Sequence, residues 1–296
     1  MHDQAEKLRQ LVKTNRLPAK SPLIKKEALA APRVLTVTSG KGGVGKTNIT
    51  ANLALTLAGK GQRVLLIDAD LGMANVDVIL GTAARYSLLD LLEDGRRTLD
   101  EVITTGPCGI KFLSGGSGIY QLANLSGAQL QRLTSQIAAF DHWADIILID
   151  TGAGIGQNVL NFVIAADEVL LITTPEPTAI TDAYALMKAY VGNRGTAPLR
   201  LIVNRVFDRE EGQGVVDTLN KVAVRFLQQP ISELGLIWED PNVIRAVKKQ
   251  TPFVLAYPDS AASRSIGEIA NRLLYGETGL HSRGIRGFFD KLLKRW

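Results

Sequence analysis

A glycine-rich stretch with two lysines, Gly40-Lys41-Gly42-Gly43-Val44-Gly45-Lys46-Thr47, could bind a phosphate group. It fits the pattern G-x-x-x-x-G-K-[ST] between an apolar run and a helical pattern, which is the context that a phosphate loop requires. Glycines let backbone N–H groups converge on phosphate oxygens, and the following helix points its positive end at them. We expect Lys46 to reach the β and γ phosphates of a nucleotide and Thr47 to offer its hydroxyl to Mg²⁺. The other predicted nucleotide-binding residues of this stretch are Gly42, Gly43, Val44, Gly45 and Asn48.

Three aspartates stand at the ends of apolar runs later in the chain. Asp68 and Asp70, in L-L-I-D-A-D, lie at positions i and i+2 and would point the same way from a strand. Asp150 closes the run I-L-I-D. A carboxylate at a strand end can bind or polarise an attacking water, although a single aspartate can also cap a helix. Three of them beside one phosphate loop favour a hydrolytic site over three unrelated caps.

Short apolar runs alternate with helical patterns from residue 33 onward and would position these residues. Each run is rich in Val, Ile and Leu on both faces, which is typical of strands buried under helices on both sides. Right-handed crossover connections between such strands give a parallel sheet. We therefore predict an α/β fold with a doubly wound, mainly parallel sheet, helices on both faces, and ligands at the carboxyl ends of the strands. The predicted strands are residues 33–39, 63–68, 110–113, 145–150, 168–173, 199–204 and 234–238.

The composition is that of an ordinary globular protein. The 296 residues are 46% hydrophobic and 21% charged, which argues against a disordered, collagen-like or coiled-coil chain. Cys108 is the single cysteine, so an intrachain disulfide framework is excluded. Because no apolar stretch is long enough to span a bilayer and the first residues lack a secretory signal's apolar core, we expect a cytoplasmic protein.

The positive charge is concentrated in two tails. The formal net charge is +5, and residues 1–33 and 283–296 hold all of the excess, which favours acidic partners for the tails over a basic DNA-binding body. An apolar stripe predicts a short N-terminal helix, and three prolines after it indicate a linker. The predicted segments are the helix at 1–17, the linker at 18–32, a nucleotide-binding body at 33–275 and a tail at 276–296.

The tail has an amphipathic pattern. Its apolar residues recur at i, i+3, i+4, i+7, i+8 and i+11 of one helix, opposite five basic residues. Such a helix either docks on the protein's own core or lies in an anionic membrane interface, and the basic excess and terminal tryptophan favour the membrane. Gly284 and Gly287 are expected to keep it poorly helical in water. The residues expected to enter the membrane are Ile285, Phe288, Phe289, Leu292, Leu293 and Trp296.

The loop has a second lysine, Lys41, near its start, and an ordinary phosphate loop does not require a lysine there. On its own it could be a solvated surface lysine, but K-G-G-V-G-K-T resembles the deviant Walker A motif of the MinD/ParA class of ATPases. In that class the early lysine reaches across a nucleotide-sandwich homodimer to the phosphates of the partner subunit. The resemblance therefore implies that Lys41 makes dimerisation depend on bound ATP.

The same resemblance implies roles for the three aspartates. Asp70 would position the attacking water, Asp68 would help to organise the Mg²⁺ site, and Asp150 would hold a magnesium-bound water. Gly154 would lie in the switch segment that follows Asp150. Together with Lys41 and Lys46, Asp70 is the predicted catalytic machinery of an ATPase.

Later segments resemble parts of the class that contact nucleotide. T-T-P-E-P-T-A-I-T-D resembles the segment that meets the partner's nucleotide and early lysine, which implies roles for Glu176 and Asp182. N-R-V-F has Phe where a guanine-binding N-K-x-D motif has its aspartate, so adenine is favoured. The resemblance assigns base contacts to Asn204, Glu239 and Asp240.

The first residues narrow the resemblance. Asp3, Gln4 and Ala5, followed by L-R-x-L ahead of a MinD-like body, resemble the flagellar-number regulator branch of the class, the FlhG, FleN or YlxH type. In that branch the extension activates a flagellar GTPase of the signal-recognition type (FlhF type), which implies that Gln4 lies near its nucleotides. Glutamine can orient an attacking water in such sites. Without the resemblance, a frayed terminal helix is favoured, because short isolated helices are marginal.

The resemblance implies a membrane-associated switch that uses ATP and Mg²⁺ and regulates flagellar number or placement. Flagellar switch-ring proteins or a transcription regulator are further implied partners, and no direct DNA binding is expected. A division-site regulator, a DNA-segregation ATPase and an ATP-binding scaffold that does not hydrolyse remain as alternatives. An iron–sulfur reductase of the nitrogenase type needs two cysteines from each subunit, which Cys108 alone does not supply.

Overall fold

The computed structural model describes residues 31–70, 75–91, 97–115, 135–276 and 282–295. Residues 31–296 cluster as one compact unit and residues 1–30 as another. The predicted N-terminal helix, nearly all of the linker and the residues Asp3, Gln4 and Ala5 lie outside the described residues, as does Trp296.

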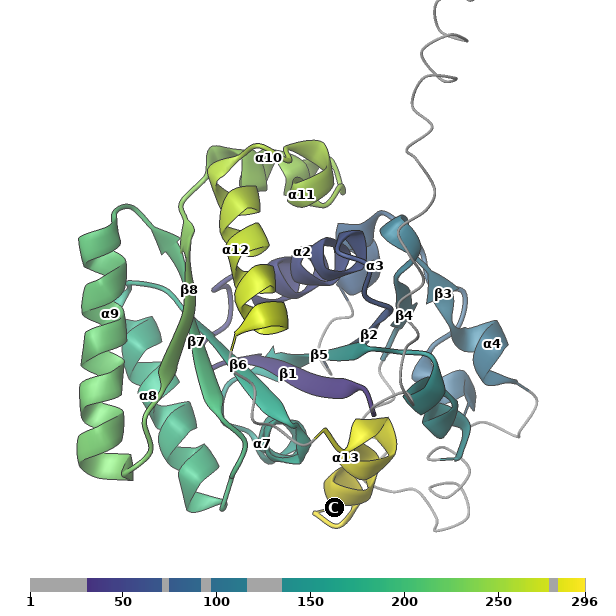
Figure 1. The fold of residues 1–296 in the computed structure, drawn as a ribbon, viewed down its shortest axis with the longest axis horizontal. Coiled ribbons are helices and arrows are strands. Elements are labelled where there is room, and N and C mark those ends of the chain that lie inside the picture. The colour runs from purple at the N-terminus through teal and green to yellow at the C-terminus, as the bar shows by residue number, and fades with distance from the viewer. Residues whose placement is uncertain (1–30, 71–74, 92–96, 116–134, 277–281, 296) are drawn as a thin grey trace, which may run out of the picture. The chain divides into compact units, whose positions relative to one another are not determined.

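Eight strands form a single sheet in the order β3-β4-β2-β5-β1-β6-β7-β8 (Figure 1). All neighbours are parallel except β3 and β4. The seven predicted strands are confirmed with slightly shifted ends, whereas the two-residue β3 was not predicted. The strands are β1 (Arg33–Ser39), β2 (Val64–Ala69), β3 (Thr104–Thr105), β4 (Lys111–Leu113), β5 (Ile146–Ala153), β6 (Glu168–Thr173), β7 (Leu199–Val206) and β8 (Ser232–Trp238).

Helices cover both faces of the sheet, which confirms the doubly wound architecture. One apolar layer joins the sheet to α7, α8, α9 and α13, and the other joins it to α2, α3, α11 and α12. The helices are α2 (Lys46–Gly59), α3 (Val76–Leu80), α4 (Leu99–Val102), α7 (Gln157–Ala165), α8 (Pro177–Gly192), α9 (Arg209–Val222), α10 (Pro241–Lys248), α11 (Phe253–Ala256), α12 (Ala261–Tyr275) and α13 (Gly284–Leu293). The described part also contains short 3-10 turns (Leu88–Leu91, Pro107–Gly109 and Ala138–His142) and a π-helix (Ala223–Leu227).

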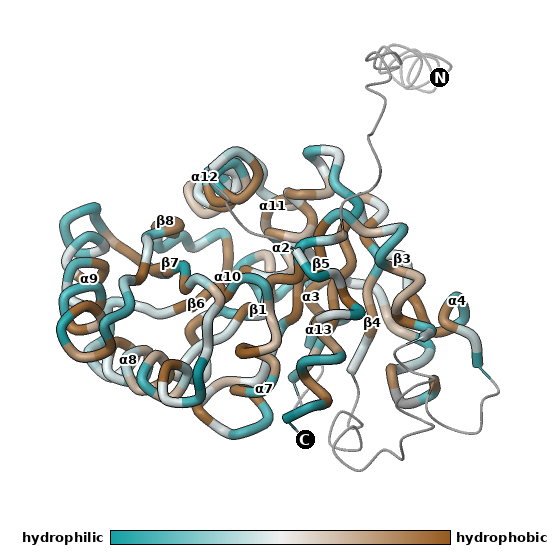
Figure 2. The backbone as a smooth tube through the Cα atoms, turned by 60° about the horizontal axis from the view of Figure 1, so that its bottom comes forward, coloured by the Kyte–Doolittle hydropathy of each residue, from teal (hydrophilic) through white to brown (hydrophobic). Residues whose placement is uncertain are grey.

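Successive residues of the central strands enter opposite layers. Val34 belongs to the layer under α7 and Leu35 to the layer under α2, and both are almost completely buried. This follows from the alternation of side chains along a strand, and it explains why the runs are apolar on both faces. Figure 2 shows both brown and teal residues in α12, as expected for a helix with one face on the sheet.

Residues Gly284–Leu293 form helix α13 where they pack on the body, and the expectation that the two glycines keep the free segment poorly helical in water stays a prediction. Gly284 has φ +70°, and a Cβ there would lie 2.4 Å from Oδ1 of Asp141. The backbone N–H of Ile285 donates to that same oxygen at 2.7 Å. The glycine thus permits the close approach by which Asp141 caps the start of the helix.

The apolar face of α13 is docked on the body, against α7, β1 and the 3-10 turn at Ala138–His142. Ile285, Phe288, Phe289 and Leu292 are each at most 2% exposed, and Leu293 packs against the same core. Of the two alternatives left by the sequence, this conformation has core docking, and membrane binding by the same face stays a prediction. None of the helices in the described part of the chain is long and apolar enough to cross a bilayer.

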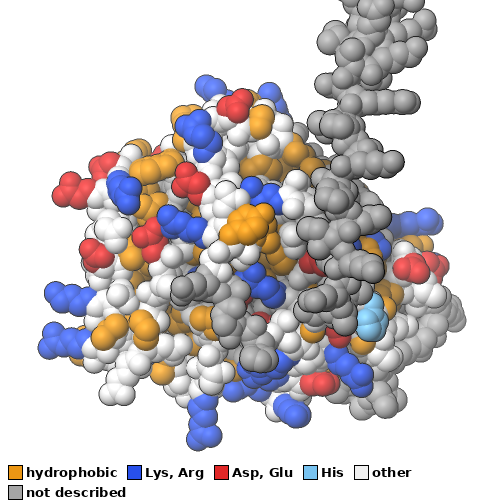
Figure 3. Space-filling view, in the orientation of Figure 1, with side chains coloured by type: hydrophobic (Ala, Val, Ile, Leu, Met, Phe, Trp, Pro, Cys, Tyr) orange, Lys and Arg blue, Asp and Glu red, His pale blue; other side chains and the backbone are white. Residues whose placement is uncertain are grey.

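Basic side chains of α13 add polar contacts to the docked face. Lys291 Nζ donates to the Ile164 carbonyl at 2.8 Å, and Arg295 donates to the Asn193 carbonyl at 2.9 Å. These carbonyls lie at the C-terminal ends of α7 and α8, where cations are favoured. Figure 3 shows Lys and Arg side chains along the lower edge of this view, on the side where Figure 1 places α13.

Candidate functional site

The glycine-rich loop joins β1 to α2 at the carboxyl end of the sheet, where ligands of doubly wound folds bind. Gly43 and Gly45 have φ +80° and +91°, which other residues rarely adopt. A Cβ on Gly45 would lie 2.6 Å from Asn204 Nδ2, and one on Gly40 would lie 2.1 Å from the Asp182 carbonyl oxygen. The loop is therefore held closely between α8 and the end of β7.

A cavity of about 410 Å³ opens over this loop. Asp70 and Asn75 enter it from the segment after β2, and Ala153 enters from the end of β5. The predicted phosphate-binding residues that line it are Gly42, Gly43, Gly45, Lys46, Thr47 and Asn48. Val44 is buried beneath the loop, and its carbonyl accepts a hydrogen bond from Asn204 at 2.8 Å.

Lys46 and Asp150 meet at the floor of the cavity. Lys46 Nζ lies 3.1 Å from Asp150 Oδ1, and Thr50 donates to the same oxygen at 3.1 Å. Burial raises the pKa of Asp150, while Lys46, Thr47 and Thr50 act to lower it. Asp150 is thus paired with the lysine that is predicted to bind phosphate, and its role in binding magnesium stays a prediction.

The surroundings of Asp150 fit a magnesium ion. Its second oxygen, Oδ2, is buried and makes no hydrogen bond within the described residues. Thr47 follows Lys46 at the start of α2 and lines the cavity. Mg²⁺ in nucleotide sites takes one or two protein oxygens and completes its shell with phosphates and water, which these two side chains match.

Both carboxylate oxygens of Asp68 accept hydrogen bonds from backbone N–H groups. Its Oδ1 accepts from the N–H of Asp70, and its Oδ2 accepts from the N–H groups of Asn75 and Val76. Burial, and then the charge of Asp150 on the neighbouring strand, raise its pKa to about 6. Asp68 therefore shapes the loop that carries Asp70, whose Oδ1 lies near the backbone of Gly152 beside the cavity.

Two predicted switch residues act through their backbone. Gly154 has φ +99°, and its N–H donates to the Ser39 carbonyl at 2.8 Å, which ties the end of β5 to the start of the phosphate loop. Asp182 lies on α8, where its carbonyl faces Gly40. A dimer role for either residue stays a prediction.

A second cavity, of about 260 Å³, adjoins the loop and suits a planar base. Asn48, Asn204 and Glu239 line it, together with apolar residues of β8, α10 and α11. Because the amide N–H of Asn204 is used by the loop carbonyl, its oxygen is left as an acceptor, which matches the exocyclic amine of adenine.

Asp240 lines the base cavity, but its carboxylate accepts hydrogen bonds from backbone N–H groups. Its Oδ1 accepts from the N–H of Asn242 at 2.9 Å, and its Oδ2 accepts from the N–H of Ala262 at 3.1 Å. Burial acts to raise its pKa, but these backbone hydrogen bonds lower it overall. Asp240 caps α10 and joins it to α12, and a contact with a base stays a prediction.

Lys41 lies on the rim rather than in the floor of the phosphate cavity. Its Nζ lies 2.8 Å from Glu176 Oε2 and 2.8 Å from Thr178 Oγ1, at the start of α8. Both charged side chains are substantially exposed, at 35% and 52%. Glu176 has its pKa lowered, chiefly by the hydrogen bond from Lys41.

Sequence reasoning missed three residues of the site. Thr50, one turn after Lys46, has a helical spacing that could have signalled its contact with Asp150. Thr178 follows the predicted Glu176 closely enough to have been considered. Arg205, which lines the base cavity, has no motif that indicates its unusual backbone.

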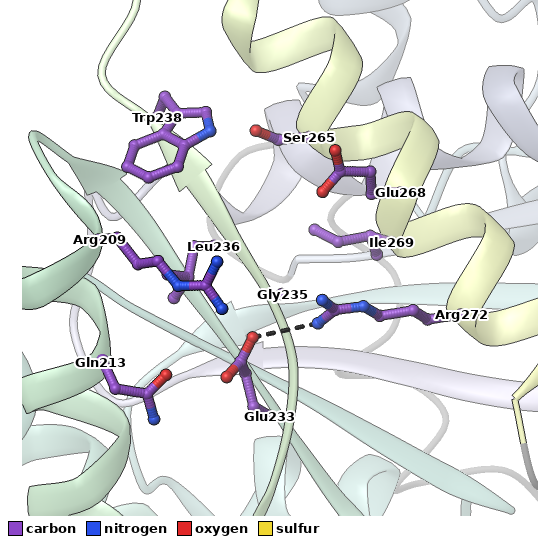
Figure 4. Close-up of a pocket in the computed structure, with 10 residues that line it drawn as sticks. All are labelled: Arg209, Gln213, Glu233, Gly235, Leu236, Trp238, Ser265, Glu268, Ile269 and Arg272. Carbon is purple, nitrogen blue, oxygen red and sulfur yellow. Dashed lines mark hydrogen bonds and ion pairs between the residues drawn. The ribbon is translucent and has the colours of Figure 1, made fainter.

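A further groove, of about 80 Å³, follows β8 at the open edge of the sheet. Figure 4 shows Arg272 reaching from α12 toward Glu233, with Arg209 and Gln213 on the α9 side. Arg272 lies 3.0 Å from Glu233 and also donates to the Leu234 carbonyl at 3.0 Å. These charged contacts cover the strand edge against pairing with another chain.

The fold and the two cavities define the class of protein. A family model described as ParA, NUBPL iron-transfer P-loop NTPase, matches residues 30–274. The chain belongs to the ParA/MinD family of P-loop NTPases, as its loop suggested.

Particular relatives can then be named. The chain is 41% identical to antiactivator FleN of Pseudomonas aeruginosa, over 88% of this chain and 93% of that protein. It is 36% identical to the flagellum site-determining protein YlxH of Helicobacter pylori, over 99% of each. Its fold matches the septum site-determining protein MinD of Pyrococcus horikoshii complexed with Mg-ADP, with a TM-score of 0.65, 25% identity and coverage of 82% of this chain and 96% of that chain.

Proposed function

We propose that this protein is an ATP-hydrolysing switch that pairs with a second copy when ATP is bound and regulates the number or placement of flagella. The observation that carries the proposal is Lys41, which is exposed on the rim of the phosphate cavity and held only by surface groups. A lysine in that position can leave its own subunit, whereas Lys46 is buried and committed to the floor. The similarity to FleN and YlxH supports the flagellar part.

ATP and Mg²⁺ are the proposed ligands. The loop N–H groups and Lys46 would bind the phosphates, and Thr47 and Asp150 would hold the ion, which would supply charge neutralisation on the phosphates. Asp70, at the cavity wall, would orient the attacking water. The Mg-ADP complex of the Pyrococcus horikoshii MinD supports this choice.

Membrane association is the proposed output. Helix α13 combines an apolar face with exposed Arg283, Arg286 and Lys294, which suits an anionic surface. Because its apolar face is buried in the conformation described above, the helix must undock before it can bind lipid. Two helices in one pair would then bind more strongly than one, by effective concentration.

The N-terminal segment is the proposed contact with a second enzyme. Its residues Asp3, Gln4 and Ala5, ahead of the linker, would activate a flagellar GTPase of the signal-recognition type. A peptide of residues 1–20 is expected to raise the GTP turnover of that enzyme, and the same peptide carrying Gln4→Ala is expected to lose most of the effect. Unchanged turnover with the parent peptide would remove this part of the proposal.

Molecular mass in solution tests the central part. The Asp70→Ala protein, stalled before hydrolysis, is expected to sediment as a pair with ATP and Mg²⁺ and as a single subunit with ADP. Adding Lys41→Ala should abolish the pair while fluorescent ATP still binds. Lys188→Ala, which removes an exposed lysine from α8, is the matched control. A stalled protein that stays single at high concentration with ATP bound would refute pairing.

A further inference from the structure

Arg205 occupies an unusual position between the two cavities. It follows Asn204 at the end of β7, where the register with β8 shifts between Asn204 and Val206. Its φ is +62°, a left-handed conformation that non-glycine residues rarely adopt. Bulges and left-handed residues re-aim side chains and are concentrated at functional sites. Here they direct Arg205 to the rim of the base cavity.

The side chain of Arg205 lies between two carboxylates. Its Nε is 3.0 Å from Glu239 Oε2, which also lines the base cavity, and its NH1 is 4.0 Å from Glu176 Oε1. The other oxygen of Glu176 is the one that holds Lys41. Lys41, Glu176, Arg205 and Glu239 thus form a row of alternating charges from the phosphate loop to the base cavity.

We propose that Arg205 is a positioning residue that couples occupancy of the base cavity to the release of Lys41 from Glu176. A base that fills the cavity meets both Arg205 and Glu239, and the guanidinium gains by stacking on an aromatic ring. The ion pair between Arg205 and Glu239 then breaks, and the guanidinium moves closer to Glu176 to form an ion pair there. The inference rests on the proposed role of Lys41 in pairing.

The sign of the coupling follows from competition for one carboxylate. With Arg205 on Glu239, Lys41 is the nearer cation to Glu176 and is held there. When Arg205 moves onto Glu176, its positive charge repels Lys41 and neutralises the carboxylate that would otherwise retain it. Base binding therefore frees Lys41, and phosphates without a base do not.

The test measures the acetylation rate of Lys41 in the single subunit, by mass spectrometry after a pulse of an N-hydroxysuccinimide ester. ADP with Mg²⁺ is compared with pyrophosphate and Mg²⁺, which supplies the phosphates without a base. In the parent, ADP is expected to raise the rate at Lys41 about two- to fivefold, the range for loss of an exposed ion pair. Lys188, exposed on α8, is the internal reference.

Two variants give opposite expected results. In Arg205→Gln the acetylation rate of Lys41 should stay low with either ligand, because the cation that competes for Glu176 is gone. In Glu239→Gln the acetylation rate of Lys41 should be high even with pyrophosphate, because Arg205 is then free to pair with Glu176. Arg209→Gln, an equal loss of charge at the start of α9, should behave as the parent.

The inference is overturned if ADP and pyrophosphate give the parent the same rate, or if Arg205→Gln still responds to ADP. If Arg205→Gln binds ADP too weakly to assay, the Glu239→Gln result decides alone. ADP is not expected to drive pairing, so these measurements concern the single subunit. A protein that never pairs with ATP would refute the proposed function and leave this result standing.

Discussion

Asp68 is a buried acid whose carboxylate organises a loop. Its pKa of about 6 in the folded state lies above the ordinary value of 3.8, so between these pH values the folded state binds more protons than the unfolded state. The free energy of unfolding therefore falls as pH rises through this window. The stabilisation is present below pH 4 and lost by about pH 6, with a total of about 3 kcal/mol at most.

The Asp68→Asn protein is expected to lack this part of the pH dependence. Denaturant unfolding at several pH values, without magnesium or nucleotide, would measure the free energy of unfolding of both proteins. Asp217→Asn, at an exposed position of α9, is the control and should retain the parent slope. An equal slope for Asp68→Asn and the parent would contradict the assignment.

The sequence predicted which residues belong to the site better than it predicted the groups that each of them contacts. Lys46 and Asp150 follow from motifs because each motif fixes both the residue and the strand or loop that carries it. The backbone contacts of Asp68 and Asp240 did not follow, since they depend on loops whose course a motif does not specify. The bulge that turns Arg205 toward Glu239 arises from the pairing of two strands and has no local signature.

Among the elements, α13 depends on a cap supplied by a distant segment. Asp141 accepts the N–H of Ile285, and a lost cap costs about 1 kcal/mol. In Asp141→Ala the amides of α13 are expected to exchange with deuterium about fivefold faster than in the parent. Asp217→Ala should leave them unchanged, and unaltered exchange in Asp141→Ala would argue that the apolar face alone holds the helix.

Periodicity identified α13 but not its docking site. The apolar stripe of the helix is the same whether it meets lipid or protein, because both are apolar surfaces. The deciding facts are a matching surface on α7 and two carbonyls placed for Lys291 and Arg295, which depend on the tertiary structure. The short β3 escaped prediction for a related reason, since two residues carry no periodicity.

For the whole molecule, pairing and lipid binding are linked if both use released α13 helices. Linkage is reciprocal, so a surface that binds the pair better than the single subunit must also favour the pair. With ATP, vesicles rich in phosphatidylglycerol are expected to lower the concentration of Asp70→Ala protein at half pairing by about tenfold or more. Phosphatidylcholine vesicles should have little effect, and an equal effect of both lipids would exclude an electrostatic contribution.

The residues that border the two tails, Ala31 and Ser282, lie side by side. Ser282, just before α13, donates to the carbonyl of Ala31 at 2.6 Å, and Arg33 and Arg283 lie against the adjacent Glu168 and Asp167. The chain just before β1 and the start of the segment that carries α13 thus lie side by side. Release of α13 from the body would therefore free its segment next to the point where the N-terminal residues join β1.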